Sequence, residues 1–324
     1  MVVADFSKGA PERQEHWNTD HAESALDCRR RAAVPPDFPV LVGGMGGWGP
    51  IVLAGLLCGA VLEARAQDSS FDSSSGCAAE TSSAGRVTGR VDRVIDGRSF
   101  ALDDGREIRL ASLEVPPATG ASSAGQASRA ALAAIVAGAA VTLRPLGGAP
   151  DRYGRTVAHV FTTGEAQAGA VAQPRAVAHP LLAAGHARVG AEIADPACSA
   201  ELYSHEREAR IARRGLWSHP QYGIVDAGDL TGLVAGRGRF SVVEGKVLSV
   251  RETGGTIYVN FGRRWSEALT VTISKRQERI FTGAGREPKA LENRRLRVRG
   301  WIEVRNGPRI EVSRPEQIEV VAAN

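Results

Sequence analysis

Arginine and tryptophan residues recur together in the last quarter of the chain, in a combination that could bind nucleic acid. Residues 237–324 contain 18 basic and 10 acidic residues, whereas residues 1–84 contain 6 basic and 11 acidic residues. Guanidinium groups pair with phosphates, and aromatic rings stack on nucleobases. The candidate nucleic-acid-binding residues are Arg263, Arg264, Trp265, Arg297, Arg299 and Trp301. The alternative is a core tryptophan beneath a charged, solvated outer face.

Four cysteines are too few for a disulfide-dense scaffold. Cys77 and Cys198 are the two that follow the N-terminal apolar segment, and in an oxidising compartment they either pair in a disulfide or remain free thiols. Two histidines, His179 and His186, flank an expected helix start and its glycine. They lack a third ligand in the sequence pattern, so we expect no metal site there.

The N-terminal third carries an export signal and little that predicts a folded domain. Residues 51–62 form an apolar run, followed by Ala64-Arg65-Ala66, a small-x-small cleavage pattern. We expect a signal peptide or membrane anchor over 45–66, a doubtful or disordered extension over 1–44 and a linker over 67–84. The predicted location is the periplasm or the medium, or, with an uncleaved segment, the inner membrane facing the periplasm.

The remaining chain is long enough for about two domains. With 43% hydrophobic and 23% charged residues, wholesale disorder is excluded. Residues 86–115 alternate apolar and polar side chains around turn signals, which predicts a β-meander. Further short strands are expected near 141–144 and 156–161, and helices over 123–136, 181–189 and 195–216. This pattern favours an α+β fold in which a small barrel is packed with helices.

Five sequence words in this region resemble the staphylococcal nuclease (thermonuclease-like) family. They read VDRVIDGRSFAL (91–102), REIRLASLEVPP (106–117), DRYGRTVAHV (151–160), LLAAGHARV (181–189) and SAELYSHEREARIARRGLW (199–217). The resemblance covers about 86–219 and assigns residues 85–222 to one domain. It implies a five-stranded OB-type barrel with three helices, which in active members cleaves phosphodiesters with one Ca²⁺.

That chemistry needs carboxylates for the cation, a base for water and arginines for the phosphate charge. By resemblance, Arg109 and Arg155 match the phosphate-binding arginines, and Glu114 matches a metal acid. Two positions depart from the family pattern, because Arg98 replaces the first metal acid and Pro117 replaces the glutamate linked to water activation. We therefore expect no cofactor, with Ca²⁺ as the cofactor if the domain is an enzyme.

The departures predict an anion pocket in place of a metal site. Arg98 should pair with Glu114, leaving Arg98, Arg109 and Arg155 clustered around one acid, which suits a phosphate. Each retained residue also has a structural interpretation. Arg155 could belong to a structural turn and Arg109 could pair with Glu114 or Asp96. We expect Asp96 to cap its turn.

Residues 223–236 are expected to be a connector, and residues 237–324 a second, basic domain of short strands. Strand signals around Asn306-Gly307-Pro308 and a single helical stretch over 276–292 predict an OB-like barrel. The segments GKVLSV, YVNFG and LRVRGWIE resemble the OB-like modules found beside nuclease-like domains in bacterial proteins.

Three functions fit these features. The first is binding of nucleic acid or another polyanion without cleavage, which Arg98 and Pro117 favour. The second is an active metal-dependent phosphodiesterase on DNA or RNA. The third is a scaffold that contacts other envelope proteins, with the membrane involved only through an uncleaved N-terminal segment.

Overall fold

The computed structural model describes Cys77 and residues 87–118, 123–163, 174–193 and 196–322. These residues lie in one compact unit, Asp68–Asn324. The expected extension over 1–44 and the expected signal segment over 45–66 therefore fall outside the described residues. Among the residues that are described, no helix has the length and apolar character needed to cross a membrane.

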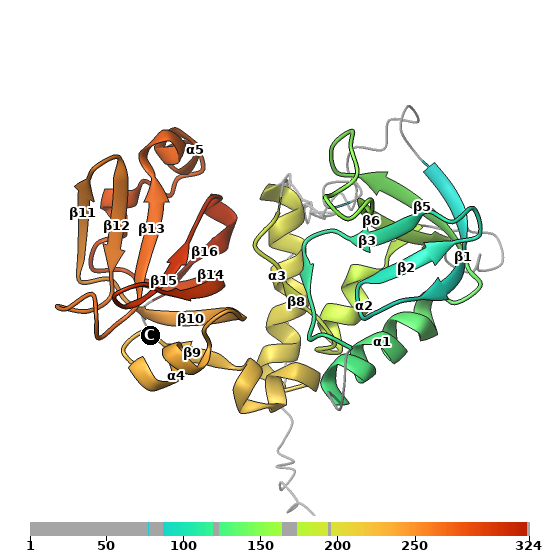
Figure 1. Ribbon diagram of the computed structural model, residues 1–324, viewed down its shortest axis with the longest axis horizontal. Coiled ribbons are helices and arrows are strands. Elements are labelled where there is room, and N and C mark those ends of the chain that lie inside the picture. The colour runs from blue at the N-terminus through green and yellow to red at the C-terminus, as the bar shows by residue number, and fades with distance from the viewer. Residues whose placement is uncertain (1–76, 78–86, 119–122, 164–173, 194–195, 323–324) are drawn as a thin grey trace, which may run out of the picture. The chain divides into compact units, whose positions relative to one another are not determined.

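The first half of the compact unit is a closed barrel of five strands (Figure 1). The strands are β1 (Val87–Val94), β2 (Ser99–Leu102), β3 (Glu107–Leu110), β5 (Ala140–Pro145) and β6 (Thr156–Thr163). Each pairs antiparallel with its neighbour in the order β3-β2-β1-β5-β6, and a parallel β3–β6 pairing closes the ring. A short strand, β7 (Pro174–Ala176), extends the sheet beside β6. The predicted barrel is confirmed.

Three helices accompany this barrel, and the first has the predicted bounds. Of the residues predicted as helical over 181–189, only 181–183 are in a helix, and Arg188–Val189 is a strand. Helix α1 (Ser123–Val136) buries Leu132 and Val136, and α2 (Ala178–Ala183) buries Leu181 and Leu182. Helix α3 (Pro196–Ile211) ends before the predicted position, because Arg213 and Gly215 have positive φ angles of 50° and 51°. Two further strands, β4 (Leu113–Glu114) and β8 (Arg188–Val189), pair with each other outside the barrel sheet.

The second half of the unit repeats the same strand order. Its strands are β10 (Phe240–Lys246), β11 (Ser249–Thr253), β12 (Thr256–Asn260), β13 (Thr270–Ser274), β14 (Arg295–Val304), β15 (Pro308–Glu311) and β16 (Ile318–Val321). The strand order is β11-β12-β13-β15-β14-β10. Its two end strands, β10 and β11, are separated by only two residues in the sequence. The β13–β15 pairing is parallel, like the β3–β6 pairing of the first barrel. The short helix α5 (Glu278–Gly283) follows β13, as α1 precedes β5. The order is that expected for an OB-type barrel, while the resemblance to bacterial OB-like modules stays a prediction.

The expected connector over 223–236 is instead folded onto the second barrel. It contains β9 (Ile224–Asp226), which pairs in parallel with β10, and helix α4 (Leu230–Ala235). The Asp229 side chain caps this helix by accepting a hydrogen bond from the Gly232 amide at 3.0 Å. The segment expected to be a connector therefore contains a strand and a helix, and Gly232 lies within that helix.

Each barrel has its own hydrophobic core, and a third, smaller cluster joins them. Phe100, Leu143 and Leu202 belong to the first core, and Val259 and Phe281 to the second. In the small cluster, Ala209 and Trp217 of the first half pack with Phe240 and Val242 of β10. Burial of this apolar surface holds β10 against the end of α3.

Candidate functional site

A cleft of about 710 Å³ lies where the two barrels meet. Its first-barrel wall carries four arginines, and its second-barrel wall is formed by the end of β14 and by β15 with the residues after it. The side chains that line the cleft include Arg98, Arg109, Glu114, Arg152, Tyr153, Arg155, Trp301, Glu303 and Glu311. The three arginines and the acid that the sequence analysis grouped together thus line one cavity.

Arg98 and Glu114 form a half-buried ion pair inside this cleft. Asp96 caps the turn before β2 by accepting the Arg98 amide at 2.8 Å, which sends the Arg98 side chain toward β4. There Arg98 Nη1 lies 2.6 Å from Glu114 Oε1 and donates to the Leu113 carbonyl at 2.9 Å. Both partners are less than one-fifth exposed, so this pair is sheltered from water.

A strained turn between β3 and β4 returns Glu114 toward the arginine on β3. Ser112 has φ of 61°, which is costly for a residue with a side chain. Its hydroxyl donates to the Glu192 carbonyl at 3.2 Å, and its carbonyl accepts the Gly190 amide at 2.7 Å. These hydrogen bonds hold Ser112 at a positive φ angle, which the local sequence does not predict.

Arg109 is the least satisfied of the three partly buried arginines of the cleft. Its Nη2 atom lies 3.7 Å from Glu114 Oε1, beyond hydrogen-bond distance, and its side chain is 22% exposed. Within the described residues, no hydrogen bond to its guanidinium is found. Burial lowers the pKa of Arg109, the Arg98 charge lowers it further, and Glu114 opposes both. An incoming anion would supply the missing acceptors and balance the surrounding charge.

Arg155 is held in a turn by Asp151. Its Nε and Nη2 donate to Asp151 Oδ2 at 3.0 and 2.8 Å, while Asp151 Oδ1 accepts the amides of Tyr153 and Arg155. Gly154 has φ of +78°, which this tight turn requires. The slight burial of Asp151 acts to raise the pKa of its carboxyl, but hydrogen bonds from Arg155 outweigh it and lower the pKa to about 2. The turn interpretation of DRYGR therefore has a direct structural basis.

Calcium does not fit these residues. A guanidinium nitrogen 2.6 Å from Glu114 Oε1 stands where the cation would have to approach that oxygen. Pro117 is exposed and does not line the cleft. Among the described residues, no group of three closely spaced ligand atoms includes Glu114.

The fold and the site together invite comparison with known proteins. Residues 107–219 match the family model described as "Staphylococcal nuclease homologue". This part of the chain is a staphylococcal nuclease homologue domain. The match begins at β3, includes Arg109, Glu114 and Arg155, and ends after the 3₁₀ helix Gly215–Ser218. A search of curated proteins found no match to the chain.

The predicted nucleic-acid strip on the C-terminal barrel is wrong in one essential part. Arg297, Arg299 and Trp301 do alternate on β14, but Arg299 is fully buried against the nuclease homologue domain. Its guanidinium contacts both oxygens of buried Glu206 at 3.2 and 3.0 Å, the Val189 carbonyl at 3.0 Å and Glu319. Glu206 is likewise 0% exposed. At Arg299, the strand face expected to meet nucleic acid packs against the other barrel, whereas Trp301 on the same face is half exposed.

The other residues of that strip are divided among different surroundings. Arg297 is mostly buried and pairs with Glu244 at 2.6 Å, whereas Arg264 is exposed and pairs with Glu267 at 2.9 Å. Trp265 lines a separate cavity of about 460 Å³ on the second barrel, and Trp301 lines the arginine cleft. Around Trp265 the basic and aromatic lining residues are Arg251, Tyr258, Arg305 and Arg309. Arg263 lines neither cavity.

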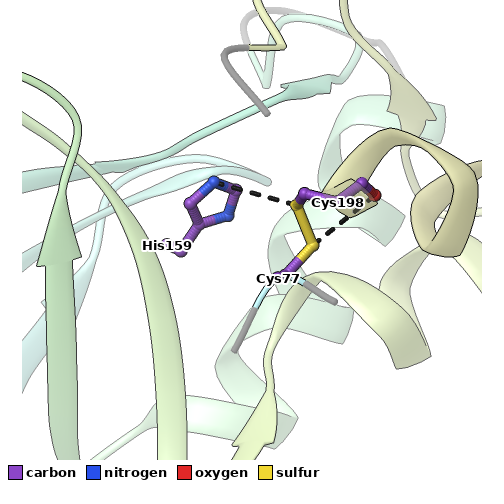
Figure 2. A group of neighbouring side chains, drawn as sticks. All are labelled: Cys77, His159 and Cys198. Atoms are coloured by element: carbon purple, nitrogen blue, oxygen red, sulfur yellow. Dashed lines mark hydrogen bonds between the residues drawn. A yellow bond between two sulfur atoms is a disulfide. The ribbon is translucent and has the colours of Figure 1, made fainter. Parts of the chain in front are cut away.

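The structure joins Cys77 to Cys198 by a disulfide between the segment before β1 and helix α3. Figure 2 shows His159 beside this bond, with its Nε2 3.9 Å from Cys198 Sγ. The two groups of possible metal ligands among the described residues are Cys77 with His159 and Cys198, and Cys77 with His179 and Glu201. Because the Cys77 sulfur is bonded to Cys198, neither group offers its thiolate to a metal.

Sequence reasoning missed part of the cleft. Arg152 extends the basic wall, and exposed Tyr153 lies between the guanidinium groups of Arg152 and Arg155, 4.8 and 4.9 Å from its ring centroid. The DRYGR word contains both residues and could have suggested them. Glu303 and Glu311 belong to the second barrel, and no local signal in the sequence links them to the arginines.

Proposed function

We propose that the nuclease homologue domain binds nucleic acid or another phosphate-bearing polyanion and does not cleave it. The observation that carries this proposal is Arg109, a half-buried guanidinium without a hydrogen-bond partner among the described residues. A phosphate oxygen would accept its donors, and neighbouring Arg98 and Arg152 would add to the attraction. Nucleic acid is favoured because the domain belongs to a nuclease family.

The absence of cleavage in this proposal rests on charge. Arg98 already neutralises Glu114, and proline at 117 has no group that can take a proton from water. The cleft can therefore hold the charge of a phosphate while lacking the cation and base that hydrolysis in this family requires.

Binding should be measured with the full chain and a labelled single-stranded oligonucleotide over a range of salt concentrations. Affinity should fall steeply as salt rises, because arginine–phosphate contacts release counterions. Arg109→Ala should weaken binding and make the salt slope shallower by about 0.7 for the lost phosphate contact. Arg263→Ala is the matched control, since Arg263 lies outside the cleft.

Two results would favour the other functions. Metal-dependent cleavage that is lost in an Arg109→Ala, Arg155→Ala double variant would establish a phosphodiesterase. A folded protein without salt-dependent binding would leave a scaffold role in the envelope.

We also propose that the protein works outside the cytoplasm, in the periplasm or the medium. The Cys77–Cys198 disulfide supports this location, because such bonds persist in oxidising compartments. Cell fractionation and N-terminal sequencing of the mature protein would test it. Recovery of an uncleaved chain with the membrane would instead favour an anchored form.

A further inference from the structure

The two walls of the cleft have different chemical character. The first barrel contributes Arg98, Arg109, Arg152 and Arg155 together with Glu114 and Glu192, whereas the second barrel contributes Trp301, Glu303 and Glu311. Glu114 is paired with Arg98 and Glu303 with Arg309. The first wall therefore keeps a net positive charge that attracts a phosphate, and Glu311 on the second wall repels it. An aromatic ring on the acidic wall offers instead a surface for an uncharged, planar group.

We propose that the second barrel completes the site by stacking a nucleobase on Trp301 while an adjacent phosphate of a single strand lies against Arg109. The inference rests on the proposed function and adds to it the substrate class, an unpaired nucleotide within a strand. It also gives the second barrel a role, since the nuclease homologue domain ends before β14 begins.

Trp301 is available for such contact. Its residue surface is 50% exposed although it belongs to a strand whose neighbouring side chains are largely buried. Phe240, its partner across the β10–β14 ladder, packs edge-to-face against the ring at a centroid distance of 6.3 Å. The indole is therefore supported on one side while part of its surface remains free for a base.

Contacts between the two barrels fix where Trp301 lies relative to the arginines. Arg299, two residues earlier on the same face of β14, is bound to Glu206 and to the Val189 carbonyl. Arg188, paired in register with Glu114, donates to the Phe240 carbonyl at 2.9 Å. Burial lowers the pKa of Arg188 to about 10, so it remains charged at neutral pH and keeps this contact. These contacts thus hold Trp301 in a fixed position relative to the arginines of the first barrel.

The acidic side chains on the wall that carries Trp301 favour a bound strand with its base near the second barrel and its phosphate near the arginines. Glu303 is already paired with Arg309 at 3.2 Å, whereas Glu311 can accept a hydrogen bond from the exocyclic amino group of cytosine or adenine, which thymine lacks. The Glu311 carboxylate also disfavours a reversed arrangement with phosphate near the second barrel. We therefore expect cytosine- or adenine-containing strands to bind more tightly than oligothymidylate.

The test compares an oligocytidylate with an abasic oligomer of equal length, using the full chain. Trp301→Ala should weaken binding of oligocytidylate by roughly 5- to 150-fold, the range for loss of one stacked base, and leave the abasic oligomer unaffected. Trp301→Phe should restore most of the affinity, because it keeps a ring. Arg109→Ala should weaken binding of both oligomers, since its contact is with phosphate.

A double-variant cycle shows whether the two residues hold one ligand. Trp301→Ala and Arg109→Ala should be non-additive, whereas Trp265→Ala, from the separate cavity, should be additive with Arg109→Ala. Equal loss for the abasic oligomer and oligocytidylate, or additivity of the first pair, in variants with wild-type thermal unfolding, would overturn the inference while leaving phosphate binding intact. If Arg109→Ala affects neither oligomer, the proposed function itself fails.

Discussion

Arg98 Nη1 lies 2.6 Å from Glu114 Oε1, with side chains 17% and 11% exposed. The resemblance to the nuclease family implies a metal-binding acid at this position, and here the guanidinium of Arg98 supplies a positive charge next to Glu114 instead. Under the proposed function, this fixed charge satisfies the carboxylate and leaves Arg109 to meet an external anion.

Replacing Arg98 with an acidic residue should allow the cleft to bind a cation. In Arg98→Asp, a second carboxylate would face Glu114 across a space that oxygen ligands can share with Ca²⁺. We expect Ca²⁺ to raise the thermal unfolding temperature of this variant and not of the wild type, because binding to the folded state stabilises it. Arg98→Ala is the control, since it removes the cation without adding a ligand. If Ca²⁺ stabilised the wild-type protein equally, the proposal that Arg98 takes the place of the cation beside Glu114 would be wrong.

The turn formed by Asp151 and Arg155 should make stability depend on pH in the acid range. The pKa of Asp151 is about 2 in the folded protein, against an ordinary value of 3.8, so the unfolded chain binds this proton more readily. The resulting stability is fully present above about pH 4 and is lost as pH falls through about 2. Urea unfolding between pH 2 and 5 should show this slope, and Asp151→Asn should flatten it. Arg155→Ala should reduce the change of unfolding free energy with pH over the same range. If that pH dependence persists in both variants, other carboxylates cause it.

The sequence was informative wherever local pattern determines structure. Helix α1 has the predicted ends, Ser123 and Val136, because alanine and leucine recur at helical spacing up to Gly138. Sequence segments of ten to twenty residues were likewise enough to predict the first barrel and the Arg98–Glu114 pair. Asp96 caps its turn, as expected from an Asp-Gly pair followed by a strand.

What the sequence could not predict depends on contacts between distant segments. Arg299 alternates with Trp301 as an exposed strand face would, and nothing nearby shows that Glu206, 93 positions earlier, covers it. Glycines at 223, 228 and 232 suggested a linker, yet pairing with β10 turns part of that segment into a strand. Alternation shows which residues share a face, and tertiary packing decides what that face meets.

Reduction of the disulfide should destabilise the protein. Cys77 and Cys198 are 121 positions apart, so their bond removes much of the freedom of the unfolded chain. Dithiothreitol should lower the free energy of unfolding by about 2–5 kcal/mol, measured with urea. A Cys77→Ser, Cys198→Ser variant should show a similar loss and no further response to dithiothreitol. Equal stability with and without reductant in the wild type would mean that the bond does not form.

The buried pair of Arg299 and Glu206 should contribute more to stability than any exposed pair on the same strand. Both side chains are 0% exposed, and burial disfavours the Arg299 charge while Glu206, Tyr203 and Glu319 raise the pKa of Arg299. Glu206→Gln would leave a buried guanidinium without its full countercharge, which typically costs about 3–5 kcal/mol. Urea unfolding followed by tryptophan fluorescence would measure the loss.

Arg295→Met provides the matched control for that measurement. Arg295 also lies on β14 and pairs with Glu244 at 2.8 Å, but half of its side chain is exposed. Solvent screens such a pair, so its loss should cost at most about 1 kcal/mol. If Glu206→Gln costs no more than Arg295→Met, the barrels are held together by the apolar cluster of Trp217 and Phe240 instead. In that case the fixed position of Trp301 would depend on apolar packing, and Phe240→Ala, not Glu206→Gln, should weaken oligonucleotide binding.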